Sequence, residues 1–236
     1  MIRTTAAVLV QNSGPVRGSL SYYLNSFLPN SYPGSGITWN DLSPINLTTT
    51  LYNTPTYTNG ILSFSASTFE YAETNSNHPD FNQWTVEVWV KFNRSLTGVV
   101  SAVICGEFNL LDKLNFSIGT NNAPTTYDIR VGFFDGSWRN VPSGLTPTLG
   151  QWYHIIGTYD GSTIKMYVGG ELLSQFSYTG TPQSGGKIRV GRRWDLSDVD
   201  ATNFIGADIP IVRVYSRALT ADEIRKNYTG ELNLFS

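Results

Sequence analysis

The chain has 236 residues and a formal net charge of −2, from 16 Lys and Arg against 18 Asp and Glu. Charged residues are only 14% of the chain, and aromatic residues are 13%. This balance provides no basic surface for a phosphate backbone, which argues against nucleic-acid binding. The many aromatic and β-branched residues supply apolar surface to bury and favour a folded, β-rich domain.

The N-terminal residues differ from the rest of the chain. Residues 1–18 precede the first patterned strand, and we interpret them as an arm that docks on a neighbour; a frayed end or an extra edge strand fits equally. The apolar run Ala6–Val10 is too short for the core of a secretory signal, and no run approaches a membrane span. Cys105 has no second cysteine to pair with and lies at the end of an apolar strand, which indicates a buried, inert thiol. We therefore expect synthesis in the cytoplasm and no membrane contact.

Patterned strands begin at Leu20. The clearest is Trp84–Phe92, in which the valines and Phe92 alternate onto one face and Glu87 and Trp89 onto the other. Trp89 on this otherwise polar face predicts either a second covering layer or an exposed aromatic ring. Weaker strands are predicted at Leu20–Leu24, Ile61–Ser65, Val99–Ile104, Leu114–Ile118, Asp128–Phe134, Lys187–Gly191 and Ile209–Tyr215.

An antiparallel meander is predicted from Gln151–Tyr159, Thr163–Val168 and Glu171–Ser177. Asp160-Gly161 joins the first two of these strands and Gly169-Gly170 the last two, and both dipeptides favour tight turns. Because no helical pattern separates the strands and no long linker divides the chain, we expect one all-β antiparallel sandwich over residues 19–236.

One short C-terminal surface helix is predicted after the last strand. Thr220 and Glu223 have the spacing of a capping box, in which each side chain accepts a hydrogen bond from the other residue's backbone N–H. Ile224 and Tyr228 lie four residues apart and give the helix a narrow apolar stripe. Gly230 is the predicted stop.

The segment Gln151–Leu173 resembles the central hairpins of laminin G-like domains in the concanavalin A-like lectin/glucanase superfamily. The matching positions are Trp152, His154, Thr158, Tyr159, Asp160 and Gly161, whereas Gly169-Gly170 stands in place of the family's Asn-Gly. Trp84–Phe92 looks like the family's aromatic strand, and Ile205–Tyr228 is similar to its closing strand and capped helix. The resemblance spans about residues 20–229 and implies a concanavalin A-like jelly roll.

A second resemblance concerns the opening segment. Ser31–Ser43 reads SYPGSGITWNDLS, which looks like the start of this domain in bacteriophage virion proteins. It implies a virion component, such as a capsid decoration protein, a fibre or a tail accessory protein. Its partners would be other virion proteins and further copies of itself, with the protein at the virion surface.

A catalytic role is not expected. Glucanase relatives carry carboxylates at short spacing on one strand, and this sequence has no such string, since Glu87 stands alone on its strand. His154 lies beside Trp152 and is interpreted as a hydrogen-bonded core or interface histidine. A Ser-His-Asp arrangement stays open, although no Gly-x-Ser-x-Gly elbow supports one.

Metal and ligand sites are the remaining candidates. Many relatives bind calcium at the rim with an Asp after the Leu-x-Phe strand, but here Leu62-Ser63-Phe64 is followed by Ser65. The acidic stretch with Asp195, Asp198 and Asp200 is therefore the candidate calcium site, against a solvated loop. The candidate sugar-stacking aromatics, against packing or a subunit contact, are Trp138, Trp194, Trp39 and Tyr32.

The leading hypothesis is therefore a non-enzymatic virion adhesion protein whose outward loops act like a lectin and whose weak sites gain from avidity. The alternatives are a free, calcium-assisted carbohydrate-binding protein that recognises cell-surface glycans and, with less support, a glycoside hydrolase.

Overall fold

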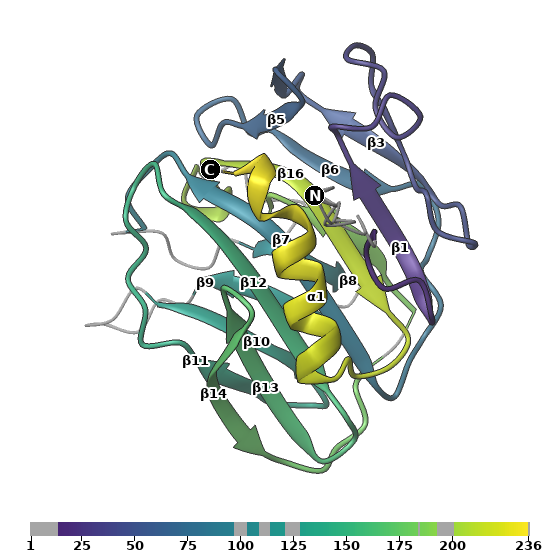
Figure 1. Cartoon of the computed structure of the whole chain (residues 1–236), viewed down its shortest axis with the longest axis vertical. Helices are drawn as coiled ribbons and strands as arrows, with labels where there is room; N and C mark the ends of the chain where they lie inside the picture. The colour runs from purple at the N-terminus through teal and green to yellow at the C-terminus, as the bar shows by residue number, and fades with distance from the viewer. Residues whose placement is uncertain are drawn as a thin grey trace, which may run out of the picture.

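Two antiparallel sheets pack face to face, and a C-terminal helix lies on the outer face of one of them (Figure 1). The computed structural model describes residues 14–96, 103–108, 114–120, 128–183, 185–192 and 201–235. Each sheet has eight strands, and every strand pair in these ranges is antiparallel. The predicted all-β sandwich with one short helix is confirmed.

The chain crosses between the two sheets several times. Sheet A consists, in spatial order, of β14 (Glu171–Ser177), β13 (Thr163–Val168), β12 (Trp152–Tyr159), β7 (Trp84–Phe92), β16 (Ala207–Tyr215), β5 (Ile61–Phe64) and β4 (Thr56–Thr58), and β1 (Leu20–Asn25) also pairs with β16. Sheet B consists of β11 (Trp138–Pro142), β10 (Ile129–Phe134), β9 (Leu114–Thr120), β8 (Val103–Phe108), β15 (Lys187–Val190), β6 (Tyr71–Thr74), β3 (Thr48–Tyr52) and β2 (Thr38–Asn40). The helix is α1 (Ala221–Glu231), and η1 (Ala201–Asn203) and η2 (Leu232–Leu234) are short 3₁₀ turns.

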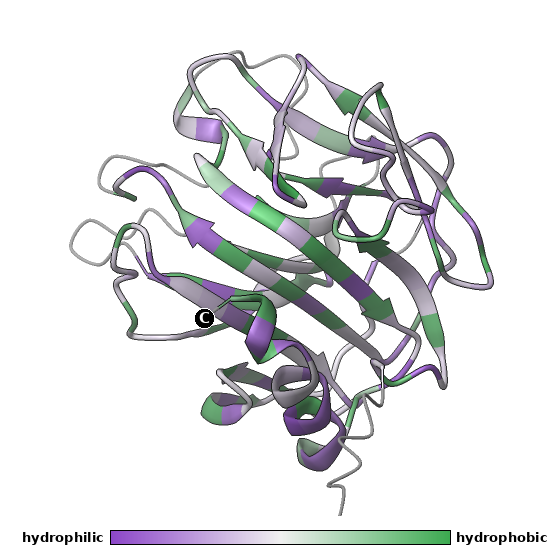
Figure 2. Cartoon of the chain, turned by 45° about the horizontal axis from the view of Figure 1, so that its top comes forward, coloured by the Kyte–Doolittle hydropathy of each residue, from purple (hydrophilic) through white to green (hydrophobic). Residues whose placement is uncertain are grey.

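Strand β7 lies at the centre of sheet A and has the predicted bounds and faces. Its valines and Phe92 are buried in the core between the sheets, while Trp89 is buried on the opposite face. The alternation of hydrophobic and hydrophilic residues is visible along the strands in Figure 2. Trp89 is therefore covered by a second layer, which was the first of the two alternatives that its position predicted.

The meander β12–β13–β14 is also confirmed. Gly169 and Gly170 turn the chain with φ of 60° and 82°, the left-handed region that glycine adopts without strain. Gly157 in β12 has a different role, since a Cβ there would lie 2.1 Å from Cγ1 of Val131 in sheet B. Glycine at this position lets the two sheets approach each other closely.

Five strands had no predicted counterpart, namely β2, β3, β4, β6 and β11. They are three to five residues long and rich in Thr, Tyr and Asn, so their sequences carry little apolar alternation. Pairing with longer neighbours defines them. Of the predicted strand Val99–Ile104, residues 99–102 lie outside the described ranges and Val103 begins β8.

Helix α1 begins as predicted, but it does not end at Gly230. Both hydrogen bonds of the Thr220–Glu223 capping box are present. The helix continues through Gly230 to Glu231 because the buried side chains of Asn227 and Glu231 bind sheet A. The predicted stop at Gly230 is therefore wrong.

A buried ionic network joins α1 to the outer face of sheet A. Arg213 of β16 donates from Nη1 to Oε1 of Glu87 at 2.7 Å and from Nη2 to Glu231. Asn227 Nδ2 donates to Glu87 Oε2 at 2.7 Å, and Trp89 Nε1 donates to Glu231 Oε2 at 2.9 Å. Two carboxylates from distant parts of the chain thus share one buried guanidinium.

The network controls the ionisation of its members. Burial raises the pKa of Glu87, but the Arg213 charge and the hydrogen bonds from His154 and Asn227 outweigh burial and lower the pKa to about 2. Burial lowers the pKa of Arg213, and the Glu231 and Glu87 carboxylates reverse this and hold it well above its usual value. Both groups are therefore charged at neutral pH and stabilise each other.

The last part of the predicted N-terminal arm packs on the domain. Val16 is buried beside α1, and its backbone N–H donates to Oδ1 of Asn227 at 2.9 Å. Residues 1–13 lie outside the described ranges. Among the described helices, none has the length and apolarity needed to cross a bilayer.

Candidate functional site

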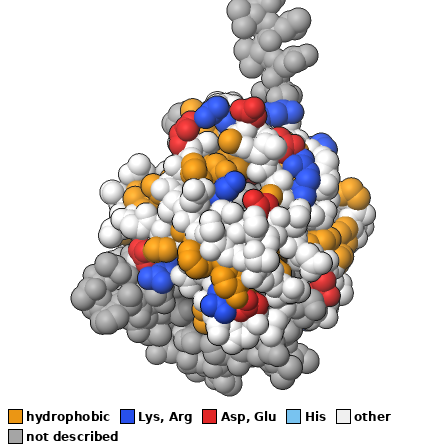
Figure 3. Space-filling model, turned by 90° about the horizontal axis from the view of Figure 1, so that it is seen from below, with side chains coloured by type: hydrophobic (Ala, Val, Ile, Leu, Met, Phe, Trp, Pro, Cys, Tyr) orange, Lys and Arg blue, Asp and Glu red, His pale blue; other side chains and the backbone are white. Residues whose placement is uncertain are grey.

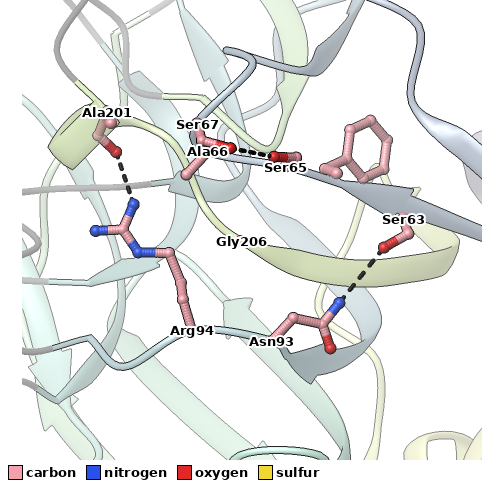
Figure 4. A pocket seen from close by; sticks show the side chains of 9 residues that line it. Ser63, Ser65, Ala66, Ser67, Asn93, Arg94, Ala201 and Gly206 are labelled. Atoms are coloured by element: carbon pink, nitrogen blue, oxygen red, sulfur yellow. Dashed lines mark hydrogen bonds between the residues drawn. The ribbon is translucent and has the colours of Figure 1, made fainter.

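An open cavity of about 350 Å³ lies at one end of the sandwich (Figure 4). Three segments that are far apart in the sequence line it. They are Ser63–Ser67, at the end of β5 and in the loop that follows; Asn93 and Arg94, directly after β7; and Ala201 and Gly206, before β16. Hydroxyl, amide and guanidinium groups therefore face a space large enough for a small ligand.

The pairing of β16 brings these segments together. Its first residue, Ala207, lies opposite Phe64 at the end of β5 on one side and opposite Phe92 at the end of β7 on the other. The loops that follow β5 and β7 therefore leave the sheet beside the loop that precedes β16. The backbone N–H of Asn93 closes the corner by donating to the carbonyl of Gly206 at 2.8 Å.

Gly206 makes room for Arg94 in the cavity wall. A Cβ at Gly206 would lie 2.7 Å from Cγ and Cδ of Arg94, so a larger residue would displace the arginine. The guanidinium is positioned by one hydrogen bond, from Nη1 to the carbonyl of Ala201 at 2.9 Å. Its Nε and Nη2 have no hydrogen-bond partner among the described residues and are available to a ligand.

The carboxylate beside the cavity is fully engaged. Asp208 pairs with Lys91 Nζ at 2.8 Å and accepts hydrogen bonds from Ser63 Oγ and Asn93 Nδ2, each at 2.6 Å. Among the described residues that line the cavity, Arg94 is the one charged side chain. The electrostatic character of this wall is positive.

The described wall does not fit calcium, because a hard cation needs several oxygen ligands with negative charge and this wall offers a guanidinium. No group of three or more potential metal ligands occurs in the described part of the chain. The predicted ligands Asp195, Asp198 and Asp200 lie outside that part, as does the predicted stacking residue Trp194. The calcium site and the stacking role of Trp194 therefore remain predictions.

Trp39 and Tyr32 lie in the core, which agrees with the packing alternative for these two residues. Trp39 is completely buried and packs against Phe64, with ring centroids 6.5 Å apart. Tyr32 is 3% exposed and packs edge-to-face on Tyr57. The Gly- and Pro-rich sequence around both residues suggests exposed loops, but the segment folds back over β1 and inserts both rings into the core.

Of the predicted aromatics within the described ranges, Trp138 is the one that lies at the surface. Its side chain is 44% exposed at the start of β11 and packs edge-to-face on Phe134, with ring centroids 5.5 Å apart. No residue of β10 or β11 lines the cavity. The structure therefore separates Trp138 from the cavity and makes it an independent surface feature.

The two histidines are buried structural residues. His154 Nε2 lies 2.8 Å from Oε1 of Glu87 in the network beneath α1, as its core interpretation predicts. His78 contacts Ser21 Oγ through Nε2 and Glu107 through Nδ1, the order of a catalytic triad. However, all three side chains are buried and Ser21 donates its proton to the carbonyl of Val214, so this constellation is structural. Cys105 is also buried, and burial raises the pKa of its thiol.

Residues 65–225 match the family described as the concanavalin A-like lectin/glucanases superfamily. The chain belongs to this superfamily. The match covers the larger part of the chain and agrees with the two-sheet architecture, so the predicted jelly roll is confirmed. No curated protein matches the sequence.

Solved structures share the superfamily fold at low sequence identity. Domain 4 of an extracellular arabinanase from Geobacillus stearothermophilus, in complex with arabinotriose, has 15% identity and a TM-score of 0.69 over 90% of this chain and 100% of its own. The receptor-binding domain of a botulinum neurotoxin of mosaic serotype C/D has 16% identity and a TM-score of 0.67 over 91% of this chain. This chain spans 51% of that domain's length. A heptameric pentraxin from Limulus polyphemus has 16% identity and a TM-score of 0.54 over 66% of this chain and 73% of its own.

The cavity residues were not predicted as a site. The sequence signal that could have found them is the polar pair Asn93-Arg94 directly after the buried strand of the superfamily's aromatic pattern. A second signal is Ser65, which stands where the resembled family often has an aspartate. These residues come together only when β5 and β7 pair on either side of β16.

Proposed function

We propose that this protein is a non-catalytic carbohydrate-binding domain that takes a short saccharide in the cavity between the β5, β7 and β16 loops. The observation that carries the proposal is the wall itself, in which serine hydroxyls, Asn93 and the partly unengaged Arg94 surround about 350 Å³ of open space. Sugar hydroxyls are recognised by such fixed donors and acceptors, and the Arg94 charge favours a saccharide with an acidic group.

Two further observations support the proposal. Domain 4 of the arabinanase, which has the same fold, is in complex with arabinotriose. No Asp or Glu occurs among the described residues that line the cavity, so the acid and nucleophile that retaining glycosidases need have no candidates there. A binding role is therefore favoured over hydrolysis.

The experiment is a glycan array with the full chain and two variants that add a bulky ring. Ser67→Trp fills the cavity from its exposed edge, and Ser137→Trp adds the same ring to the exposed β10–β11 turn. We expect binding that Ser67→Trp abolishes and Ser137→Trp retains, with unchanged thermal unfolding in both. An empty array, or binding that survives Ser67→Trp and is lost in Trp138→Ala or Trp194→Ala, would contradict the cavity as the site.

A second proposal is that the domain serves as a virion adhesion component, supported by the resemblance of Ser31–Ser43 to phage virion proteins. The structure shows which N-terminal residues can be deleted to test this proposal without disturbing the domain. A deletion of residues 1–18 would remove Val16, whose burial and hydrogen bond to Asn227 stabilise the domain. Deletion of residues 1–13 leaves these contacts intact. Unchanged incorporation of the shortened protein into particles would exclude docking through residues 1–13.

A further inference from the structure

Hydrophobic side chains reach the surface at both ends of the sandwich, but their surroundings differ. At the end viewed in Figure 3, they lie among charged and polar side chains. At the other end, where α1 finishes, they line a second cavity of about 240 Å³ between the helix, the start of β12 and the turn after β13. The aromatic wall of this cavity consists of Trp89, Trp152, Tyr228 and Phe235.

The four rings of this wall hold one another in place. Phe235 stacks on Trp89 with ring centroids 3.9 Å apart and lies 4.7 Å from the ring of Trp152. Tyr228 stacks on Trp89 at 5.8 Å. Trp89 is buried, whereas the other three rings are only partly buried. Aromatic rings fixed in this way favour contact with a flat, apolar ring.

Gly169 leaves room for the cavity beside His154. On one side His154 pairs with Trp89 of β7, and on the other its carbonyl accepts the backbone N–H of Gly169 at 2.9 Å. Because Gly169 has no side chain, the flank of the His154 ring that faces away from β7 is not filled from this position. Both residues line the cavity.

The His154 ring has an unsatisfied acceptor on that flank. Its Nε2 lies 2.8 Å from Oε1 of Glu87, and a carboxylate oxygen only accepts, so Nε2 carries the proton. Nδ1 of the neutral ring is then an acceptor, and it has no hydrogen-bond partner among the described residues although the side chain is completely buried. The two nitrogens point to opposite sides of an imidazole, so Nδ1 is directed toward Gly169. A buried acceptor without a donor is unfavourable, and a ligand that donates to it would be stabilised.

The lining of the cavity favours an uncharged ligand. No Asp, Glu, Lys or Arg occurs among the described residues that line it. An ion would lose its hydration there without a partner of opposite charge. A saccharide needs partners for several hydroxyl groups, whereas the buried part of this cavity offers the single acceptor of His154.

We propose that this cavity binds a small neutral aromatic molecule with one N–H or O–H donor, such as an indole or a phenol. The ring packs against Trp152 and Phe235, and the donor binds Nδ1 of His154. This cavity and the one between the β5, β7 and β16 loops share no described lining residue. Aromatic binding therefore does not rest on the proposed saccharide binding, and either can fail without the other.

The test titrates the full chain with indole and with 1-methylindole, which keeps the ring system but has no N–H. Calorimetry up to about 2 mM ligand should show indole binding and an affinity for 1-methylindole that is about tenfold or more lower. Nitrogen-15 spectra of the imidazole side chains add a direct readout. The Nδ1 resonance of His154 should shift with indole and not with 1-methylindole, while His78, which does not line the cavity, should not shift with either.

Two variants of the 3₁₀ turn η2 locate the site. Leu232 and Leu234 are both 42% exposed, but only Leu232 is among the described residues that line the cavity. Leu232→Trp should fill the cavity and abolish indole binding, and the matched control Leu234→Trp should retain it. Thermal unfolding checks that both variants are folded, and the comparison of the two ligands in the wild type keeps the test valid if either is not.

Four results would overturn the proposal. They are no indole binding to the wild type, equal affinities for indole and 1-methylindole, an Nδ1 resonance of His154 that indole does not move, and binding that survives in a folded Leu232→Trp variant.

Discussion

Arg213 and Arg94 occupy opposite environments in the same sheet. Arg213, beneath α1, is completely buried between the carboxylates of Glu87 and Glu231. Arg94, in the wall of the cavity, has a single hydrogen bond to the carbonyl of Ala201 and no carboxylate partner in the described part of the chain. Arg213 lies within the central strand β16, and Arg94 lies just after the end of the neighbouring strand β7.

The difference separates a structural charge from a charge that can serve a ligand. A buried ion that loses its partner costs several kcal/mol, so the Arg213 network must stay intact for the domain to fold. A half-buried guanidinium such as that of Arg94, with donors that no carboxylate engages, has less effect on folding and can donate hydrogen bonds to a bound molecule. Four predictions test this contrast.

The largest effect is expected at Arg213. Arg213→Met keeps the apolar stem but leaves Glu87 and Glu231 without their cation, and it should lower the free energy of unfolding by about 3 to 5 kcal/mol. Urea denaturation followed by tryptophan fluorescence measures the change. Arg225→Ala is the control, because that exposed arginine pairs with Glu171 at the surface and should cost less than about 1 kcal/mol. Equal losses in the two variants would contradict the contrast.

Acid should weaken the same network. The pKa of Glu87 in the folded chain is about 2, below its usual value of 4.5, so its contribution is complete above pH 4.5 and is lost as the pH falls toward 2. The difference corresponds to about 3 kcal/mol of stability. Urea midpoints between pH 5 and pH 2 should fall steeply for the wild type and less steeply for Glu87→Gln. Identical slopes would show that other carboxylates dominate acid unfolding.

Arg94 should behave in the opposite way. Arg94→Ala should leave the urea midpoint within about 0.5 kcal/mol of the wild type, since it removes one hydrogen bond at the surface of the domain. Affinity for an acidic saccharide found on the array should fall by about 10- to 100-fold, the equivalent of one charged hydrogen bond. Calorimetric titration measures it, with Arg139→Ala as the control. A large loss of stability in Arg94→Ala would make this residue structural as well.

The smallest effect is expected at the start of α1. Thr220→Ala removes the capping box and should cost about 1 kcal/mol. Comparison with Arg213→Met in the same urea experiment shows whether the cap or the buried charges hold the helix on sheet A. A loss as large as that of Arg213→Met would assign the main role to the cap.

The sequence is informative about the long strands and much less so about the short ones. Strand β7 alternates strongly because its valines pack between the sheets, and the turn dipeptides delimit the meander, so the sequence predicts these bounds within a residue or two. Strands β3 and β6 are defined by pairing with their neighbours, which no local pattern encodes. Gly230 fails as a stop for a related reason, because the tertiary contacts of Glu231 outweigh the local preference.

The cavity is harder to predict than the fold. Serine, asparagine and arginine after a strand are ordinary residues for a surface loop, and their convergence depends on the pairing of β16 with both β5 and β7. Trp39 is the converse case. It stands among turn-forming residues, yet β2 directs its ring into the core beside Phe64. Around Trp39 the local sequence indicates a turn-rich segment but not which way its side chains face.

The position of the Arg213 network along the chain has a consequence for biosynthesis. Glu87 leaves the ribosome early, Arg213 much later, and Glu231 later still, so the centre of sheet A stays incomplete until residue 231 is available. Strand β1 likewise waits for β16, about 190 residues further on. Such long-range pairing slows folding, and nascent chains of this protein expose the edge of β7 that β16 later covers for most of translation. We expect the domain to fold only after β16 and α1 have been synthesised.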